Sequence, residues 1–423
     1  MFTVLQRYTG WLILATLLLF ICSKLVPSLF IAVAVIAWLV VIVEWTRLSA
    51  GARRQAYFLL GIGVVALLFS AQQGVFLGWQ KIMTQNLQLL PMFIAVSFLA
   101  LTNPAAQDDN LPRGKRAVVT TAVGTNLLGA VINLSILFVF GDRLERNNTL
   151  TRPQAILLGR TFCAAAWWSP FFISAGVALT YAPGMQYNRT IVPGLILCAV
   201  AICYSIIEVG FIRRMEFTGY PVRMESLTVP FLLAVAVITG HHFFPEMGMI
   251  LLICLVAPPA AILLMRSRPR LPQLQDFISH RIVSTVNQFV LFLTAGIFSI
   301  GITSVIQVYP EIFNFAGKTF TPGLFATISA LLIVLGLIGV HPLVGISIVS
   351  PMLLPLHPDS SRLAFLFLTS WAISTGSSPL SGVGLVLTSR YNVSSRSILA
   401  SNIHYVAAMW LMANLVNVLY FGS

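Results

Sequence analysis

Long apolar stretches separated by short polar connections run the whole length of the chain. A typical stretch holds about 18–25 residues rich in Leu, Ile, Val, Ala and Phe, the length that a helix needs to cross a bilayer. The stretches lack the period-two alternation of a barrel strand, and lipid admits only helices and closed barrels because backbone groups must be paired within the protein. The pattern therefore predicts an all-α polytopic membrane protein. We expect helical stretches at 9–23, 27–46, 56–71, 87–103, 117–141, 153–182, 190–212, 227–243, 248–265, 282–307, 322–356, 361–388 and 395–421.

Some of these stretches are interrupted or too long for a single crossing. Residues 322–356 carry several prolines and glycines, and 153–182 and 361–388 are each interrupted by a Ser-Pro pair. Proline breaks the helical hydrogen-bond ladder, and irregular backbone at membrane depth is tolerated only against protein or a water-filled cavity. We therefore interpret 117–141 and 322–356 as re-entrant hairpins, and 153–182 and 361–388 as broken helices.

A sequence repeat relates the two halves of the chain. The segment from Ser169-Pro170 to Thr180 resembles the segment from Ser378-Pro379 to Thr388. The likeness extends in both directions at an offset of 207–210 residues, which indicates an internal duplication. This predicts N-terminal scaffold helices at 1–86, a first repeat at 87–212, linking scaffold helices at 213–281 and a second repeat at 282–423.

The distribution of Lys and Arg predicts the topology, because these residues collect in cytoplasmic loops. If each hairpin returns to its own side and each broken helix crosses once, the chain makes about eleven crossings and the two repeats are inverted. With the N-terminus cytoplasmic and the C-terminus outside, the outer loops hold only Lys24, Lys81, Arg189, Lys318 and Arg362. Swapping the hairpin and the broken helix in the first repeat moves only the loop 142–152 to the other side of the membrane, so this alternative stays open. The N-terminal segment resembles a signal peptide without a cleavage motif, and we expect an uncleaved first helix.

Composition narrows the function. Hydrophobic residues make up 58% of the chain and charged residues 9%, with a formal net charge of +13. The positive charge fits cytoplasmic loops, and no basic run with interleaved aromatics indicates a nucleic-acid partner. The sequence has neither a CxxC pair nor an HExxH or GxSxG motif, so we expect no metal site, no cofactor and no enzyme activity.

The interruptions are the candidate binding sites, since inverted repeats with discontinuous helices are typical of secondary transporters. A helix break exposes N–H groups that favour anions at one side and C=O groups that favour cations at the other. Hydroxyls, amides and small residues without fixed charge surround all the interruptions. The predicted solute-binding residues are Thr125, Asn126, Asn133, Ser169, Pro170, Ser174, Gly176, His341, Pro342, Ser377, Ser378, Pro379, Ser381, Gly382 and Gly384.

Three ionisable residues within the apolar stretches are candidates for a functional role. Glu208 is either an interfacial partner of Arg213 and Arg214 or a coupling group, because a carboxylate at membrane depth is a functional candidate. His341 beside Pro342 can titrate near neutral pH or hydrogen-bond a solute. Arg160 either snorkels to the cytoplasmic face or balances an anionic solute.

The crossings, the two inverted hairpin and broken-helix units and the Ser/Thr/Gly/Pro/Asn-rich tips resemble the ion transporter superfamily over residues 87–421. This group includes the divalent anion:sodium symporters, the arsenite-type anion transporters and the membrane subunits of tripartite carboxylate transporters. The symporters carry a Ser-Asn-Thr triplet at each hairpin tip. This chain has Gly124-Thr125-Asn126 in the first and Gly-Val-His-Pro in the second. The resemblance implies an elevator mechanism, in which hairpins and broken helices move against a scaffold that dimerises.

These patterns predict a secondary transporter of a small anionic solute, a carboxylate or an oxyanion, in a bacterial-type inner membrane. The expected partners are the solute, the lipid bilayer and a second copy of the chain, with Na⁺ or H⁺ as the coupling ion. A cation/proton antiporter, which needs Glu208 or His341 to titrate, is the alternative within transport. A flippase or a membrane enzyme acting on a lipid-linked substrate is the alternative outside it.

Overall fold

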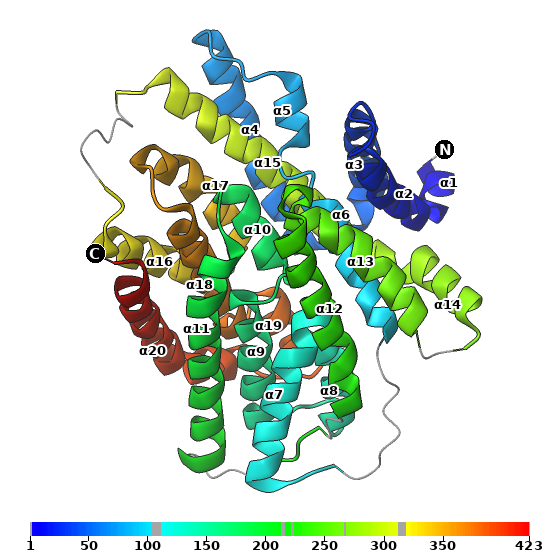
Figure 1. Cartoon of the computed structure of the whole chain (residues 1–423), viewed down its shortest axis with the longest axis vertical. Coiled ribbons are helices and arrows are strands. Elements are labelled where there is room, and N and C mark those ends of the chain that lie inside the picture. The colour runs from blue at the N-terminus through cyan, green and yellow to red at the C-terminus, as the bar shows by residue number, and fades with distance from the viewer. Residues whose placement is uncertain are drawn as a thin grey trace. The chain divides into compact units, whose positions relative to one another are not determined.

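The computed structural model describes residues 2–102, 111–212, 216–220, 224–265, 268–311 and 319–422. Within those ranges the chain is built of helices and loops, and β structure is confined to isolated bridges (Figure 1). Helices long and apolar enough to cross a bilayer are Leu29–Arg47, Ala50–Gln72, Trp79–Thr102, Tyr187–Ile212, Arg270–Val308 and Ser395–Phe421. The all-α membrane class predicted from the apolar stretches is confirmed, whereas the number of crossings stays a prediction.

The helices gather into two compact units. The first unit comprises residues 1–102, 236–318 and 347–356, and the second comprises 103–235, 319–346 and 357–423. The first unit contains the helices α1 (Phe2–Arg7), α2 (Thr9–Cys22), α3 (Leu29–Glu44), α4 (Ala50–Gln72), α5 (Trp79–Thr84), α6 (Leu89–Ser97), α13 (Met249–Leu264), α14 (Arg270–Asp276) and α15 (Val286–Val308). The end of α12 (Met224–Phe243) and residues 347–353 of α17 (Pro342–Leu353) also belong to it.

Close packing of α4 against α15 forms the centre of the first unit. Gly63 of α4 and Gly301 of α15 meet backbone to backbone, and a Cβ on Gly301 would come 2.7 Å from the Gly63 carbonyl oxygen. Lipid provides no hydrophobic force between helices, so small residues that let backbones approach supply the contact instead. Several aromatic and aliphatic side chains of α3 and α4 face outward, including Ile31, Val35 and Phe58, as expected of surfaces that meet lipid.

The second unit holds both predicted hairpins' first helices and both broken helices. Its helices are α7 (Gly114–Ile132), α8 (Ser135–Leu144), α9 (Arg152–Cys163), α10 (Ile173–Tyr181), α11 (Tyr187–Ile207), α16 (Pro322–Leu337), α18 (Ser360–Ser377), α19 (Gly382–Ser389) and α20 (Ser395–Phe421), with the first turn of α17 (Pro342–Leu353). Helix starts follow local chemistry: Pro322 lies at the first position of α16 behind the capping hydroxyl of Thr321, and Asp359 caps α18 through the Arg362 N–H.

The structure differs from the sequence-based expectation in two respects, the short helices between the long ones and the position of the first hairpin tip. Short helices α1, α5 and α14 lie in segments expected to be connections, because a single helical turn or two carries too few residues for a periodic signal. The chain reversal between α7 and α8 lies at Asn133, whereas Gly124, Thr125 and Asn126 lie within α7. Placing the first hairpin tip at those three residues was wrong, since Asn133 adopts a φ of 60° that ends the helix.

Candidate solute-binding turns

Two interrupted helices in the second unit carry equivalent turns. The first turn, Trp168–Phe172, separates the 3₁₀ segment η3 (Ala164–Trp167) at the end of α9 from α10. The second turn, Ser378–Ser381, separates α18 from α19. Each contains a Ser-Pro pair, and proline has no N–H to continue the ladder, so the chain leaves the helix at that point.

The serine of each turn makes the same pair of contacts. Ser169 Oγ donates to the Ala130 carbonyl of α7 and accepts from the Phe171 N–H at 3.2 Å. Ser378 Oγ donates to the Leu337 carbonyl of α16 at 3.1 Å and accepts from the Leu380 N–H at 3.2 Å. Both serines are buried, at 1% exposure. The hydroxyl thus fixes each turn to the end of the preceding hairpin helix.

The hairpin reversals also contact the turns. Asn133 Nδ2 donates to the Phe171 carbonyl at 3.0 Å. In the other half, Gly339 has a φ of 99° and packs so closely on Leu380 that a Cβ would lie 2.9 Å from the leucine Cδ1. The structure therefore brings the end of a helix and a helix break together twice, once at Asn133 and once at Gly339.

A second hydroxyl braces each turn from its other side. Ser174 Oγ donates to the Ala166 carbonyl at 2.9 Å. Ser381 Oγ donates to the Thr375 carbonyl at 2.7 Å and accepts from the Gly384 N–H at 3.0 Å, which caps α19. A Cβ on Gly384 would collide with the Ser378 carbonyl oxygen. The backbone of α19 therefore approaches the turn so closely that only glycine fits at position 384.

Several buried hydroxyls on helices of the second unit have no hydrogen-bond partner among the described residues. Thr125 Oγ1 on α7 and Ser377 Oγ on α18 are both on residues at 0% exposure. Thr375 Oγ1, one residue before Gly376, is a third. An unpaired buried polar group costs about 1–3 kcal/mol, and such groups are natural donors to a bound solute. Thr375 was not predicted from the sequence; its place in the last turn before Ser377-Ser378-Pro379 was the available signal.

The remaining predicted residues differ in their surroundings. Asn126 is buried and its amide donates to the Thr161 carbonyl at 2.9 Å. His341 stacks edge-on to Trp371, and its Nδ1 accepts from the Leu343 N–H at 3.2 Å, which caps the start of α17 at Pro342. Beside these, Pro170, Gly176 and Pro379 are buried, whereas Gly382 is exposed with open space beyond its Cα.

Arg160 lies at 0% exposure in a closed polar network of the second unit. Its Nη1 contacts Glu208 Oε2 at 2.6 Å, its Nε donates to Asn402 Oδ1 at 2.6 Å and its Nη2 donates to the Ser401 carbonyl at 2.7 Å. The rings of Tyr405 and Tyr204 lie 4.4 and 5.6 Å from the guanidinium carbon, within cation–π range.

This network changes the interpretation of both charged residues. Arg160 does not snorkel to an interface, and Glu208 already neutralises it. The expected partners of Glu208, Arg213 and Arg214, lie outside the described residues. The contacts of Arg160 with Glu208, Asn402 and Ser401 join α9, the end of α11 and α20. Removing one member of such a buried pair leaves an uncompensated charge.

Two further polar clusters lie at loops of the second unit. Arg390 binds Asp142 through two hydrogen bonds of 2.9 Å, and the Tyr391 hydroxyl donates to the same carboxylate at 2.7 Å. Burial raises the pKa of Asp142, but the hydrogen bonds from Arg390 and Tyr391 and the arginine charge outweigh it, so this pKa lies below its ordinary value. The other cluster joins Arg189 to Asp359 at 2.8 Å.

The fold is similar to that of a solved membrane transporter. The crystal structure of the Alcanivorax borkumensis YdaH transporter, described as having an unusual topology, matches with a TM-score of 0.52 over 87% of this chain and 98% of that chain, at 13% sequence identity. No protein-family model and no curated protein matches the chain. The chain is thus a helical membrane protein that shares its fold with a transporter.

Proposed function

We propose that this protein is a secondary active transporter that moves a small anionic solute, a carboxylate or an oxyanion, across a bacterial-type inner membrane. The observation that carries the proposal is the pair of equivalent turns: Ser169 and Ser378, 209 positions apart, make the same two hydrogen bonds to a hairpin helix and to the residue two positions on. Such a match supports a structural duplication, and duplicated broken helices are the usual site of solute binding in transporters.

The polar groups around the turns suit an anion better than a cation. Thr125, Thr375 and Ser377 offer buried hydroxyls without partners, and α10 and α19 begin at the turns with their positive dipole ends. Because Glu208 is already paired with Arg160, the solute would be recognised by hydroxyls and backbone N–H groups. Transport by proton antiport would instead need Glu208 to leave this ion pair.

The division into two compact units supports an elevator mechanism. Both turns, both hairpin reversals and the Arg160 network belong to the second unit, which would move as a transport domain. The first unit would be the scaffold and the site of homodimer formation. The proposed topology is the one expected from the sequence, with the N-terminus cytoplasmic and the C-terminus outside. The proposed coupling ion is Na⁺ or H⁺.

The test is solute binding and uptake by variants that remove only the unpaired hydroxyls. The candidate solutes come from a thermal-shift screen of carboxylates and oxyanions with and without Na⁺, since a ligand of the native state raises the melting temperature. Thr125→Val and Ser377→Ala should each weaken binding about tenfold, the loss of roughly one good hydrogen bond.

Two matched controls, Thr161 and Ser370, lie on α9 and α18. Thr161→Val and Ser370→Ala remove hydroxyls that donate to the Leu157 and Leu366 carbonyls within their own helices, and they should leave uptake unchanged. A bulky residue at Ser169 or Ser378 should abolish uptake in proteoliposomes. Full uptake by Thr125→Val, Ser377→Ala and these bulky variants alike would remove the turns from the site.

A further inference from the structure

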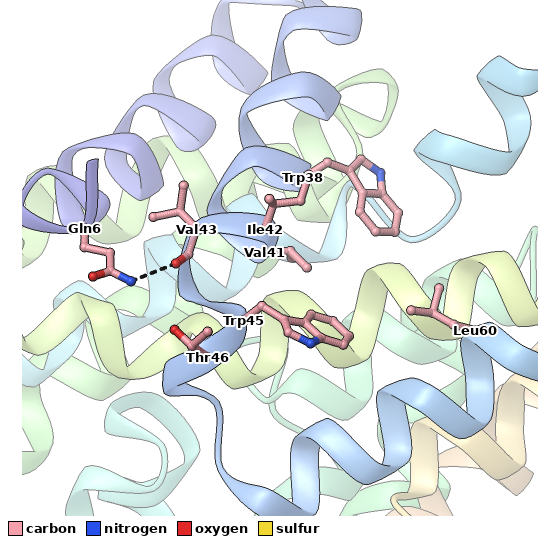
Figure 2. A pocket seen from close by; sticks show the side chains of 8 residues that line it. All are labelled: Gln6, Trp38, Val41, Ile42, Val43, Trp45, Thr46 and Leu60. Carbon is pink, nitrogen blue, oxygen red and sulfur yellow. Dashed lines mark hydrogen bonds between the residues drawn. The ribbon is translucent and has the colours of Figure 1, made fainter. Parts of the chain in front are cut away.

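An apolar groove of about 700 Å³ follows the last turns of α3 in the first unit. Trp38, Ile42 and Trp45 line it from α3 and the adjoining 3₁₀ turn η1 (Trp45–Arg47), and Leu60 lines it from α4. These three positions share one face of the helix and its 3₁₀ extension by their spacing, and Figure 2 shows both indole rings on the side of Leu60. The groove lies on two helices that are long and apolar enough to span a bilayer.

The groove presents mainly ring faces and methyl groups, because both indole N–H groups and the Gln6 amide N–H group are already engaged. Trp38 Nε1 donates to the Met83 carbonyl at 3.1 Å, and Trp45 Nε1 donates to the Tyr57 hydroxyl at 3.2 Å. The Gln6 amide at its edge donates to the Val43 carbonyl at 3.0 Å (Figure 2). An occupant would therefore be held by apolar contact.

Positive charge surrounds the end of the groove where α3 stops. Arg47 follows Thr46 of the groove wall with a side chain at 57% exposure, and Arg53 and Arg54 open the next helix. The neighbouring carboxylate, Glu44, is buried at 2%, accepts a hydrogen bond from the Thr9 hydroxyl at 2.6 Å and lies 3.6 Å from Arg47 Nη1, so it neutralises part of the charge of Arg47. Three arginines therefore lie near a single carboxylate, and the side chains of Arg47 and Arg54 are exposed.

Aromatic residues at this end of α3 are typical of the membrane–water interface. Trp45 and Tyr57 form an edge-to-face pair with ring centroids 5.3 Å apart, and Tyr57 is exposed. Trp and Tyr concentrate at the level of lipid headgroups. A smaller pocket of about 340 Å³, lined by Arg47, His280 and Asn287, lies at the same end of α3 and adds polar surroundings.

We propose that this groove binds an acyl chain of an anionic phospholipid, with the lipid phosphate against Arg47, Arg53 and Arg54. The distance along the helix from Trp38 to Thr46 is about 12 Å at the α-helical rise per residue, enough for a substantial part of one chain. Basic pockets between membrane helices on the cytoplasmic side hold anionic headgroups, and the sequence-based topology places these arginines on that side.

Charge favours a lipid over a second copy of the protein. A twofold interface through this face would bring the same patch of each protomer together, so the arginines at the end of α3 would approach arginines. An anionic lipid supplies the opposite charge and an apolar tail together.

The test measures lipid retention by the full-length protein in mild detergent with native mass spectrometry. Phosphatidylglycerol should remain bound at concentrations where phosphatidylcholine of the same chain length is lost. Leu60→Trp, which fills the groove, should abolish the bound phosphatidylglycerol. Arg47→Gln with Arg54→Gln should weaken phosphatidylglycerol binding about tenfold or more. Arg53 is left unchanged in this variant because its side chain bonds the Leu48 carbonyl.

The matched control removes two other exposed cations of the same unit. Lys24→Gln with Lys81→Gln should retain phosphatidylglycerol as the unaltered chain does. Equal retention of the two lipids, or equal retention of phosphatidylglycerol by the arginine and lysine double variants, would overturn the proposal. So would disulfide formation between protomers through an Ile42→Cys substitution in liposomes, since the groove would then hold a second copy.

Discussion

Arg160 and Glu208 form an ion pair of 2.6 Å whose arginine is wholly buried. The two residues lie 48 positions apart on α9 and on the π-helical turn that follows α11. Asn402 and Ser401 of α20 complete the coordination of the guanidinium. The pair therefore joins three helices of the second unit, and several consequences can be measured.

Single substitutions of this pair should destabilise the protein far more than a double one. Arg160→Leu removes the buried cation that Glu208 faces, and Glu208→Leu leaves the wholly buried Arg160 without its carboxylate, each at a cost of about 3–5 kcal/mol. The double substitution should recover much of that loss, because no charge remains buried. Melting temperatures in detergent measure the effect. Arg189→Gln, at a half-exposed pair, is the control and should change stability by no more than about 1 kcal/mol; a double variant as unstable as the sum of the singles would contradict the pairing.

Substitution by alanine should be harmful at only one of the two glycines of α19. Gly384→Ala places a methyl group against the Ser378 carbonyl and must displace the second turn, whereas Gly382→Ala points into open space. We expect Gly384→Ala to lower both stability, by about 1–3 kcal/mol, and solute binding. Gly382→Ala should leave both near the unaltered values. Equal behaviour of the two variants in melting and binding measurements would mean that the turn is not held closely.

Asn133 should be more sensitive to alanine than to glycine. Its φ of 60° and ψ of −146° lie in a region that favours glycine, and its amide holds the Phe171 carbonyl. Asn133→Gly loses only the hydrogen bond, about 1 kcal/mol, whereas Asn133→Ala loses the bond and adds strain of about 1–3 kcal/mol. Denaturant titration followed by tryptophan fluorescence would rank them, and the opposite order would contradict the strained backbone.

Acid should weaken the contact between Asp142 and Arg390. Because the pKa of Asp142 is lowered in the folded protein, the stabilisation is fully present above the unfolded value of about 3.9 and is lost as the pH falls through the folded pKa. Both side chains are about half exposed, so the effect should stay below about 1 kcal/mol. Melting curves between pH 3 and 7 should show this acid-dependent loss in the unaltered chain and its absence in Asp142→Asn, relative to each protein at neutral pH.

Labelling of single cysteines tests the inverted topology. Asn392 donates to the Asn148 carbonyl at 3.0 Å, so Asn148→Cys and Asn392→Cys should react from the same side of the membrane. Asn188→Cys, next to the Arg189–Asp359 pair, should react from the opposite side. The background needs Cys22→Ser and Cys203→Ser, because both native thiols are exposed. Reaction of Asn148→Cys and Asn188→Cys from one side would refute the predicted threading.

The sequence by itself determined the all-α membrane class and nearly all of the apolar helices, because hydrophobic length and proline act locally along the chain. It also located the Ser-Pro breaks at Ser169 and Ser378 and the reversal at Gly339. Which partner each polar group takes was decided only by the tertiary structure. Arg160 meets Glu208 across 48 residues and Asn402 across 242, and nothing local distinguishes such a pair from two interfacial charges. The cost of an unpaired charge away from water, rather than any periodicity in the chain, brings these residues together.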